Sequence, residues 1–465
     1  MNDFKRTIDP IERVPRAPCH AWRTKVIRSK TSIRVASLAA AAALLAACGG
    51  GSGDASATGA ATTGAATTAA PTGEPIVIGA PFAQSGPAGI ADHKDCWNGT
   101  DLAIEEINNA GGVNGRPLAL SVTDIDILTP EGITAAFQKL AAEKVSAIQS
   151  AFVIIPPPAL DAAAAYGAPY MSGDTNIDAQ KLATADTAKY GNYFTDPAET
   201  YYGSGFVTFL TQLSDSGSWT PSNNKVDIIR GDTAYNKNIA DATEAAIAAS
   251  GGKWELGQII DITAGTKDWG PVIAKLQANP AGAIMVDHWI GAELASFSQQ
   301  FAGDPVADSL VYLQYGPSQP EFLQIAGAAA EGFVWGTVIG VGNTSDQDKA
   351  FRAAYQAKFG VDDVSMGMVY TGWCYDTVNV LANAWKNVDP ADFAAVNEYI
   401  KANPYDGVTG HLDFSNQSVP IYPTVETDPA KGVTHYFYQV QGGRHTTIAP
   451  DGDAEAAFVK PAWMQ

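Results

Sequence analysis

Short apolar runs alternate along the chain with longer stretches whose apolar residues recur at helical spacing. Residues 76–80 have the pattern of a buried strand, and residues 92–109 have that of a helix that ends at a double glycine. The pattern then predicts strands and helices in turn, at residues 118–124, 131–143, 145–148, 159–166 and 169–171. Strands that alternate with helices of this length indicate βαβ units and a parallel sheet.

The alternation starts again near residue 225 and predicts a second, similar unit. Its expected strands and helices are, in order, residues 225–230, 234–250, 254–260, 268–279, 283–286, 291–301 and 310–313. Helices are also expected at residues 346–359 and 375–386, and a strand at residues 433–440. Two successive sets favour two α/β lobes over one large sheet. Because ligands bind beyond the carboxyl ends of parallel strands, two such edges facing each other predict a cleft.

The first 48 residues differ in character from the rest of the 465-residue chain. They carry nine Lys and Arg against three acids, and their apolar run at residues 37–47 is too short to span a bilayer but matches the core of a secretory signal peptide. The run ends in Leu-Ala-Ala-Cys, which resembles the lipobox of bacterial lipoproteins and predicts lipidation of Cys48. The alternative is an ordinary cleavage site with an incidental cysteine. Residues 49–74, rich in Gly, Ala and Thr, are expected to form a flexible linker.

Without this leader the chain has 20 basic and 46 acidic residues, a net charge near -26. Such a surface repels phosphate backbones and anionic lipid headgroups. We therefore expect no nucleic-acid partner, and membrane contact only through the lipid anchor. The sequence has no G-x-S-x-G elbow, no H-E-x-x-H pair and no phosphate-binding G-x-x-x-x-G-K loop, and its six histidines are scattered. These observations predict a protein that is not an enzyme and has no metal or cofactor.

Several segments resemble the leucine/isoleucine/valine-binding family of type I periplasmic solute-binding proteins. The most specific is AIEEINNAGGVNGRP at residues 103–117, followed by DITAGTKDWGPVIAKL at 261–276, AEGF at 330–333 and YDTV at 375–378. The resemblance covers residues 75–440. It implies two Rossmann-like lobes with parallel central sheets, joined by three hinge crossings near residues 194–200, 333–337 and 410–414. The lobes are then expected at residues 75–195 with 336–411, and at residues 196–335 with 412–465.

The resemblance also places Cys96 and Cys374 in the same lobe. A disulfide between them is expected in an oxidising compartment. The alternative is a pair of buried free thiols.

In the first lobe, the resemblance implies that hydroxyls and helix-start N–H groups hold the carboxylate of an amino acid ligand. Thr175 fits the place of the family's carboxylate-binding threonine, and Ser172 precedes it in the same loop. The serine-rich loop expected after the third strand is replaced by apolar residues that include Phe152, and Asp174 adds a negative charge. Both departures argue against a plain α-amino acid. Thr175 and Asp174 could instead only cap a helix.

In the second lobe, the resemblance implies aromatic ligand contacts at Tyr235 and Trp289, which could instead be core residues. Tyr315 stands where the family places an acidic partner for the ligand ammonium, and Asp287 could substitute for that acid. Asp92 lies where some members carry a pocket tyrosine. A small, flat or amide-bearing ligand would stack on the aromatic side chains.

The expected function is that of an extracytoplasmic solute-binding component of an ABC importer. The protein would be a lipid-anchored monomer that binds an amino acid, amide or aromatic acid by hinge closure and delivers it to ABC permease subunits. The alternative is an extracytoplasmic ligand sensor that presents its closed form to a signalling receptor.

Overall fold

The computed structural model describes residues 70–86, 88–415, 425–426 and 428–464. The predicted signal peptide, the predicted lipidation site Cys48 and most of the predicted linker lie outside these residues. In the described part of the chain, no helix is long and apolar enough to cross a membrane.

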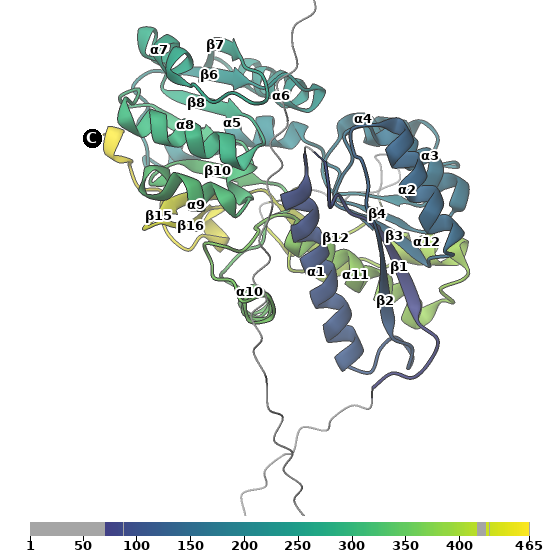
Figure 1. Cartoon of the computed structure of the whole chain (residues 1–465). Helices are drawn as coiled ribbons and strands as arrows, with labels where there is room; N and C mark the ends of the chain where they lie inside the picture. Colours follow the sequence, from purple (N-terminus) through teal and green to yellow (C-terminus); the bar gives the residue numbers. More distant parts are fainter. Residues whose placement is uncertain (1–69, 87, 416–424, 427, 465) are drawn as a thin grey trace, which may run out of the picture. The chain divides into compact units, whose positions relative to one another are not determined.

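A five-stranded, fully parallel sheet forms the core of the first lobe. In spatial order its strands are β2 (Leu118–Thr123), β1 (Ile76–Pro81), β3 (Ala147–Ser150), β4 (Tyr170–Ser172) and β5 (Tyr193–Phe194). In β1, Ile78 lies opposite Leu120 on one side and Ala147 on the other. Helices cover both faces of this sheet (Figure 1), and β1 is therefore buried along nearly its whole length.

A seven-stranded sheet forms the core of the second lobe. In spatial order its strands are β16 (Arg444–Ala449), β15 (Tyr436–Gln441), β10 (Val334–Thr337), β9 (Leu310–Leu313), β8 (Ala283–Asp287), β6 (Lys225–Arg230) and β7 (Glu255–Asp261). The strands from β10 to β7 are parallel, and β15 and β16 add an antiparallel edge. Thr337 pairs with Tyr436, so this sheet extends beyond the expected lobe boundary at residue 335. The other lobe boundaries stay a prediction.

Helices flank each sheet in the arrangement that the βαβ pattern predicts. In the first lobe α1 and α11 cover one face and α2 and α3 the other, and in the second lobe α5 and α6 lie opposite α7 and α8 (Figure 1). The helices are α1 (Ile90–Asn109), α2 (Pro130–Ala142), α3 (Pro156–Tyr166), α4 (Ile177–Ala185), α5 (Thr200–Asp215), α6 (Ala234–Ala249), α7 (Gly270–Ala278), α8 (Gly291–Gly303), α9 (Glu321–Ala326), α10 (Asp346–Phe359), α11 (Tyr370–Asn387) and α12 (Phe393–Ala402).

A small third sheet contains β11 (Tyr405–Gly407), β12 (Gly410–Leu412), β14 (Val433–Thr434) and β13 (Val425–Glu426), in that order. The single strand expected at residues 433–440 is therefore wrong. The chain passes at His435 from β14, which pairs with β12 and β13, to β15, which pairs with β10 and β16. An uninterrupted apolar alternation cannot show that its two ends pair with different partners.

Helices α4, α5, α9 and α12 were not expected from the sequence. Helix α5 contains two glycines and several aromatic and β-branched residues, which have low intrinsic helix propensity. It forms because Phe206, Phe209 and Leu210 bury its apolar face in the second lobe. Tertiary packing here outweighs local preference.

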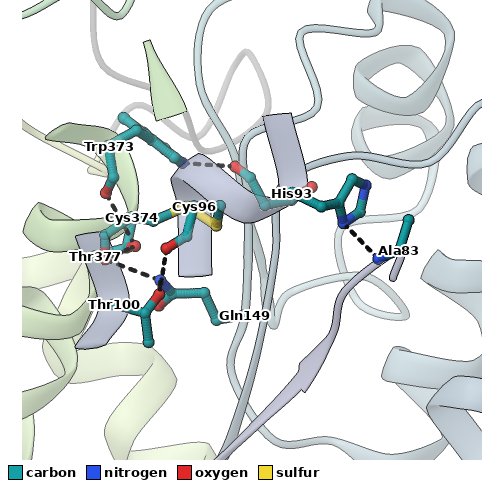
Figure 2. The surroundings of a disulfide bond; sticks show 9 residues. Ala83, His93, Cys96, Thr100, Gln149, Trp373, Cys374 and Thr377 are labelled. Atoms are coloured by element: carbon teal, nitrogen blue, oxygen red, sulfur yellow. Dashed lines mark hydrogen bonds between the residues drawn. A yellow bond between two sulfur atoms is a disulfide. The ribbon is translucent and has the colours of Figure 1, made fainter. Parts of the chain in front are cut away.

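Helices α1 and α11 approach each other closely because a glycine lies at their contact. A Cβ atom on Gly99 would lie 2.1 Å from the carbonyl oxygen of Thr371, so a larger residue would push the helices apart. One turn earlier, Cys96 is bonded to Cys374, with their Cα atoms 5.1 Å apart (Figure 2). The predicted disulfide is confirmed.

The sheet is tied to this helix pair by one buried amide. Gln149 of β3 donates to the hydroxyl of Thr100 at 2.6 Å and to the carbonyl of Cys374 at 2.8 Å (Figure 2). A buried amide costs free energy unless it is hydrogen-bonded, so Thr100 of α1 and Cys374 of α11 must stay within reach of Gln149. These two bonds hold both helices in place on the sheet.

Replacing both cysteines is expected to lower the free energy of unfolding by about 2–5 kcal/mol, because the bond joins residues 278 positions apart and constrains the unfolded chain. Calorimetry of Cys96→Ser/Cys374→Ser should show a lower melting temperature. A reducing agent should lower the wild-type melting temperature to a similar value and leave the double variant unchanged. Equal wild-type melting temperatures with and without reductant would contradict a stabilising bridge.

Candidate ligand-binding site

A cavity of about 100 Å³ lies where loops from the two larger sheets meet. Its lining residues follow the carboxyl ends of β3 and β4 in the first lobe and of β6, β8 and β9 in the second, and one comes from the start of α11. They are Phe152, Val153, Ile154, Asp174, Thr175, Asn176, Thr233, Ala234, Tyr235, Trp289, Tyr315 and Tyr370. The cavity therefore lies where the facing strand ends predicted a cleft.

Six of the nine predicted ligand contacts line this cavity, and their role in binding stays a prediction. They are Phe152, Asp174, Thr175, Tyr235, Trp289 and Tyr315. The other three, Asp92, Ser172 and Asp287, lie outside the lining.

Asp174 is the ionisable carboxyl of the cavity wall. The residue is only 6% exposed. Burial raises the pKa of Asp174 well above its ordinary value, and the nearby carboxylate of Glu199 adds to the rise, while hydrogen bonds from the backbone of Val153 and Asn176 oppose it. The ionised form of Asp174 is therefore poorly stabilised in the protein without a ligand.

Helix α3 starts beside the cavity, directly after the loop of Phe152. Its first three residues are Pro156, Pro157 and Pro158. Proline has no backbone N–H, so these positions provide no donor at the end of the helix that normally attracts anions.

Helix α4 starts at the other first-lobe loop, and its first N–H groups already have partners. The side-chain oxygen of Asn176 accepts from the N–H groups of Asp178 and Ala179 at 2.9 and 3.0 Å. The N–H of Ile177 donates to the carboxylate of Glu199 at 2.6 Å. Asn176, rather than Thr175 or Asp174, is thus the capping residue of this helix.

The second lobe contributes aromatic rings to the cavity. Tyr235 lies in the first turn of α6, where Thr233 caps the helix by accepting from the N–H of Asn236. The hydroxyl of Tyr235 accepts from Gln314 at 2.8 Å. Trp289 follows β8 and is half-buried. The hydrogen bond to Gln314 and the helix cap fix the ring of Tyr235 at the cavity wall.

Asp287 and Ser172 lie behind the cavity rather than in its wall. The side-chain amide of Asn236 donates to both the carboxylate and the carbonyl of Asp287, at 2.8 and 2.9 Å, and this anchors the start of α6. The carbonyl of Ser172 accepts from the indole N–H of Trp373 at 3.0 Å, which anchors α11 to β4. Each residue therefore supports an element that carries cavity residues.

Asp92 connects the two lobes. It lies in the first turn of α1, and its carboxylate accepts from the amide of Gln319 at 3.1 and 3.2 Å and from the hydroxyl of Tyr315 at 3.3 Å. Burial raises the pKa of Asp92 to about 7, and Gln319 opposes the rise. Asp92 is thus hydrogen-bonded to two second-lobe side chains without lining the cavity itself.

Tyr370, Asn176 and Thr233 line the cavity without having been predicted. Asn176 and Thr233 carry a signal in the sequence, since both precede helices as capping residues. Tyr370 carries none, because it lies almost 200 residues from Asp174 and reaches the cavity only through the packing of α11 on the first sheet.

Two of the expected crossing segments contact each other at the lobe boundary. The hydroxyl of Tyr202, next to the first crossing, lies 3.2 Å from the hydroxyl of Thr337 in the second. Beside them, Glu199 accepts from Ile177 on the first-lobe side and from Asn238 of α6 at 2.8 Å on the other. The chain between the lobes is thus hydrogen-bonded to both.

A family model described as periplasmic binding protein matches residues 75–422. The chain belongs to this family. Its type I periplasmic solute-binding fold, of the branched-chain amino acid class, agrees with the two parallel sheets described above.

Relatives of this periplasmic binding protein are similar to it over most of its length. A Leu/Ile/Val-binding protein homolog of Brucella suis is 26% identical over 361 residues, which cover 75% of this chain and 88% of the relative. A structure from Silicibacter pomeroyi is assigned to branched-chain amino acid ABC transport. It is 31% identical in sequence and has a TM-score of 0.75, and the match covers 84% of this chain and all of the Silicibacter chain.

A substrate-binding protein of Streptococcus pneumoniae, solved with isoleucine, is similar in fold, at 22% identity and a TM-score of 0.65, over 83% of this chain and 100% of its own. These relatives are binding components of ABC transporters. Family membership also implies a location outside the cytoplasm. In the described residues, no group of three or more His, Cys, Asp and Glu side chains is placed to hold a metal ion.

Asp92→Asn should change how stability depends on pH. Because the pKa of Asp92 rises from 3.8 to about 7 on folding, the folded state binds its proton more tightly, and wild-type stability falls as the pH rises through this window. Relative to wild type, Asp92→Asn should therefore gain about 1 kcal/mol for each pH unit between pH ~5 and ~7. Urea unfolding of both proteins across this range measures the difference.

Asp124→Asn is the matched control. A hydrogen bond from Ser85 lowers the pKa of Asp124, so this carboxyl stays ionised above pH ~5 in both states. Its difference from wild type should be constant over the same range. If the stability difference between Asp92→Asn and wild type is also constant with pH, the pKa of Asp92 is not raised in the folded protein.

Proposed function

We propose that this protein is the solute-binding component of an ABC importer and closes its two lobes over a small polar organic ligand. The observation that carries the proposal is the origin of the cavity wall, which comes from strand ends of both sheets. A ligand in this cavity would contact both lobes at once. It would then stabilise the arrangement in which they are close, and this is how hinge closure is driven.

The contacts between the lobes support a hinge rather than a fixed junction. Polar contacts cross the lobe boundary from Asp92 to Gln319 and Tyr315 and from Ile177 to Glu199. When the lobes separate, water can replace such hydrogen bonds at small net cost. A large apolar interface would resist opening far more strongly.

The cavity also limits the ligand. Its volume is about 100 Å³. Its wall is largely aromatic, with a few polar groups that would orient a ligand. The proposed ligand is therefore compact.

A thermal-shift screen tests the proposed function. Amino acids, amides, aromatic acids and amines are added to the purified protein, and a ligand at 100 times its dissociation constant should stabilise the fold by about 2.7 kcal/mol. That corresponds to a rise of several degrees in melting temperature. If no small organic solute raises it, the solute-binding proposal fails.

Trp289→Ala should weaken the binding of a ligand found in this way by about tenfold, which corresponds to the loss of about 1.4 kcal/mol of ring contact. Isothermal titration calorimetry gives the two dissociation constants. Trp97→Ala is the control, because Trp97 is also half-buried but does not line the cavity. Equal affinities of wild type and Trp289→Ala would show that the ligand binds elsewhere.

A further inference from the structure

The cavity wall contains an acidic side chain and, among the described lining residues, no basic one. Asp174 lines the cavity, and none of the described residues that line it is Lys, Arg or His. A ligand carboxylate placed here would lie near a buried acid without a basic side chain to hold it. Like charges at close range in a poorly solvated site are strongly unfavourable.

Two further acids lie behind Asp174. The negative charges of Glu199 and Asp174 interact, as do those of Asp174 and Asp196. Asp196 is fully buried, and one of its carboxylate oxygens has no hydrogen-bond partner within the protein. Burial raises the pKa of each of these three acids, of which Asp174 lines the cavity.

Two groups that could offset a ligand carboxylate, the starts of helices α3 and α4, lack donors or have them in use. Helix α3 begins with three prolines, which have no N–H. At α4, the N–H groups of Ile177, Asp178 and Ala179 all donate to oxygens of the protein itself. The starts of α3 and α4 are therefore not available as anion sites.

The rest of the wall suits a cation. Aromatic rings from both lobes line the cavity, with Phe152 and Tyr370 on one side and Tyr235, Trp289 and Tyr315 on the other. The rings of Phe152 and Tyr370 have their centres 5.7 Å apart. The face of an aromatic ring is electron-rich and attracts ammonium groups, most strongly when water is excluded.

We propose that this cavity binds the ammonium group of a small organic amine that carries no carboxylate, with Asp174 as its counter-ion and the aromatic rings around its carbon atoms. The proposal rests on the proposed solute-binding function and names its ligand class. A bound cation would stabilise the ionised form of Asp174, which burial and its acidic neighbours disfavour in the empty protein.

Two ligand series of matched shape test the proposal. The first compares isoamylamine with isoamyl alcohol, which is neutral, and with leucine, which adds a carboxylate. The second compares choline with its neutral isostere dimethylbutanol and with glycine betaine. Titration calorimetry on the purified protein gives the dissociation constants. One or both cations should bind at least about tenfold more tightly than the neutral and the zwitterionic members of the same series. This difference corresponds to about 1.4 kcal/mol of binding free energy.

Two variants separate the role of Asp174 from a general effect of charge. Asp174→Asn should weaken binding of the cation about tenfold or more and leave binding of its neutral isostere nearly unchanged. Asp178→Asn removes the same charge from the same segment, but its side chain is 63% exposed and pairs with Lys181 at the surface. This control should bind the cation like wild type.

The proposal is overturned if leucine or glycine betaine binds more tightly than the matching amine, or if Asp174→Asn does not weaken binding of the amine. It is also overturned if neither cation binds. Tight binding of a carboxylate ligand in the thermal-shift screen would leave the solute-binding function standing and remove only the inference about its ligand. Failure of the whole screen would remove both.

Discussion

The burial of carboxylates where the two lobes meet is the constraint on which the site depends. A buried carboxylate is costly unless hydrogen bonds or a counter-charge stabilise it. Asp92 meets this requirement across the lobe boundary through Gln319 and Tyr315, and Glu199 through Ile177 and Asn238. The same hydrogen bonds therefore hold the halves in register and orient the loops that form the cavity.

This arrangement changes what the cavity can bind. Because Glu199 uses the first N–H of α4 and Asn176 uses the next two, the helix end is closed to an external anion. Asp174 then places a carboxyl group without a basic neighbour among the aromatic rings of the lining. The fold itself is shared with a substrate-binding protein solved with isoleucine. In such folds the lobes provide the closing motion, and a few loop residues decide the ligand.

Much of the candidate site could be predicted from the sequence, because loops that follow parallel strands meet at one edge of the sheet. Asp174, Trp289 and Tyr235 could be placed by their position after strands. Asp92 and Asp287 could not be distinguished from ligand contacts, since their partners Gln319 and Asn236 are brought to them only by packing. Tyr370 was missed because α11 begins five residues before the expected start and reaches the cavity from the far end of the chain.

The sequence by itself determined the alternating strands and helices, the division into two parallel-sheet units and the family, because these follow from local periodicity and short motifs. Only the tertiary structure decided which acid and which ring meet which partner. It also decided that the apolar run near His435 divides between two sheets. The physical reason is that burial and hydrogen bonding depend on distances in space. Residues far apart in the chain come close to one another only when both lobes have packed.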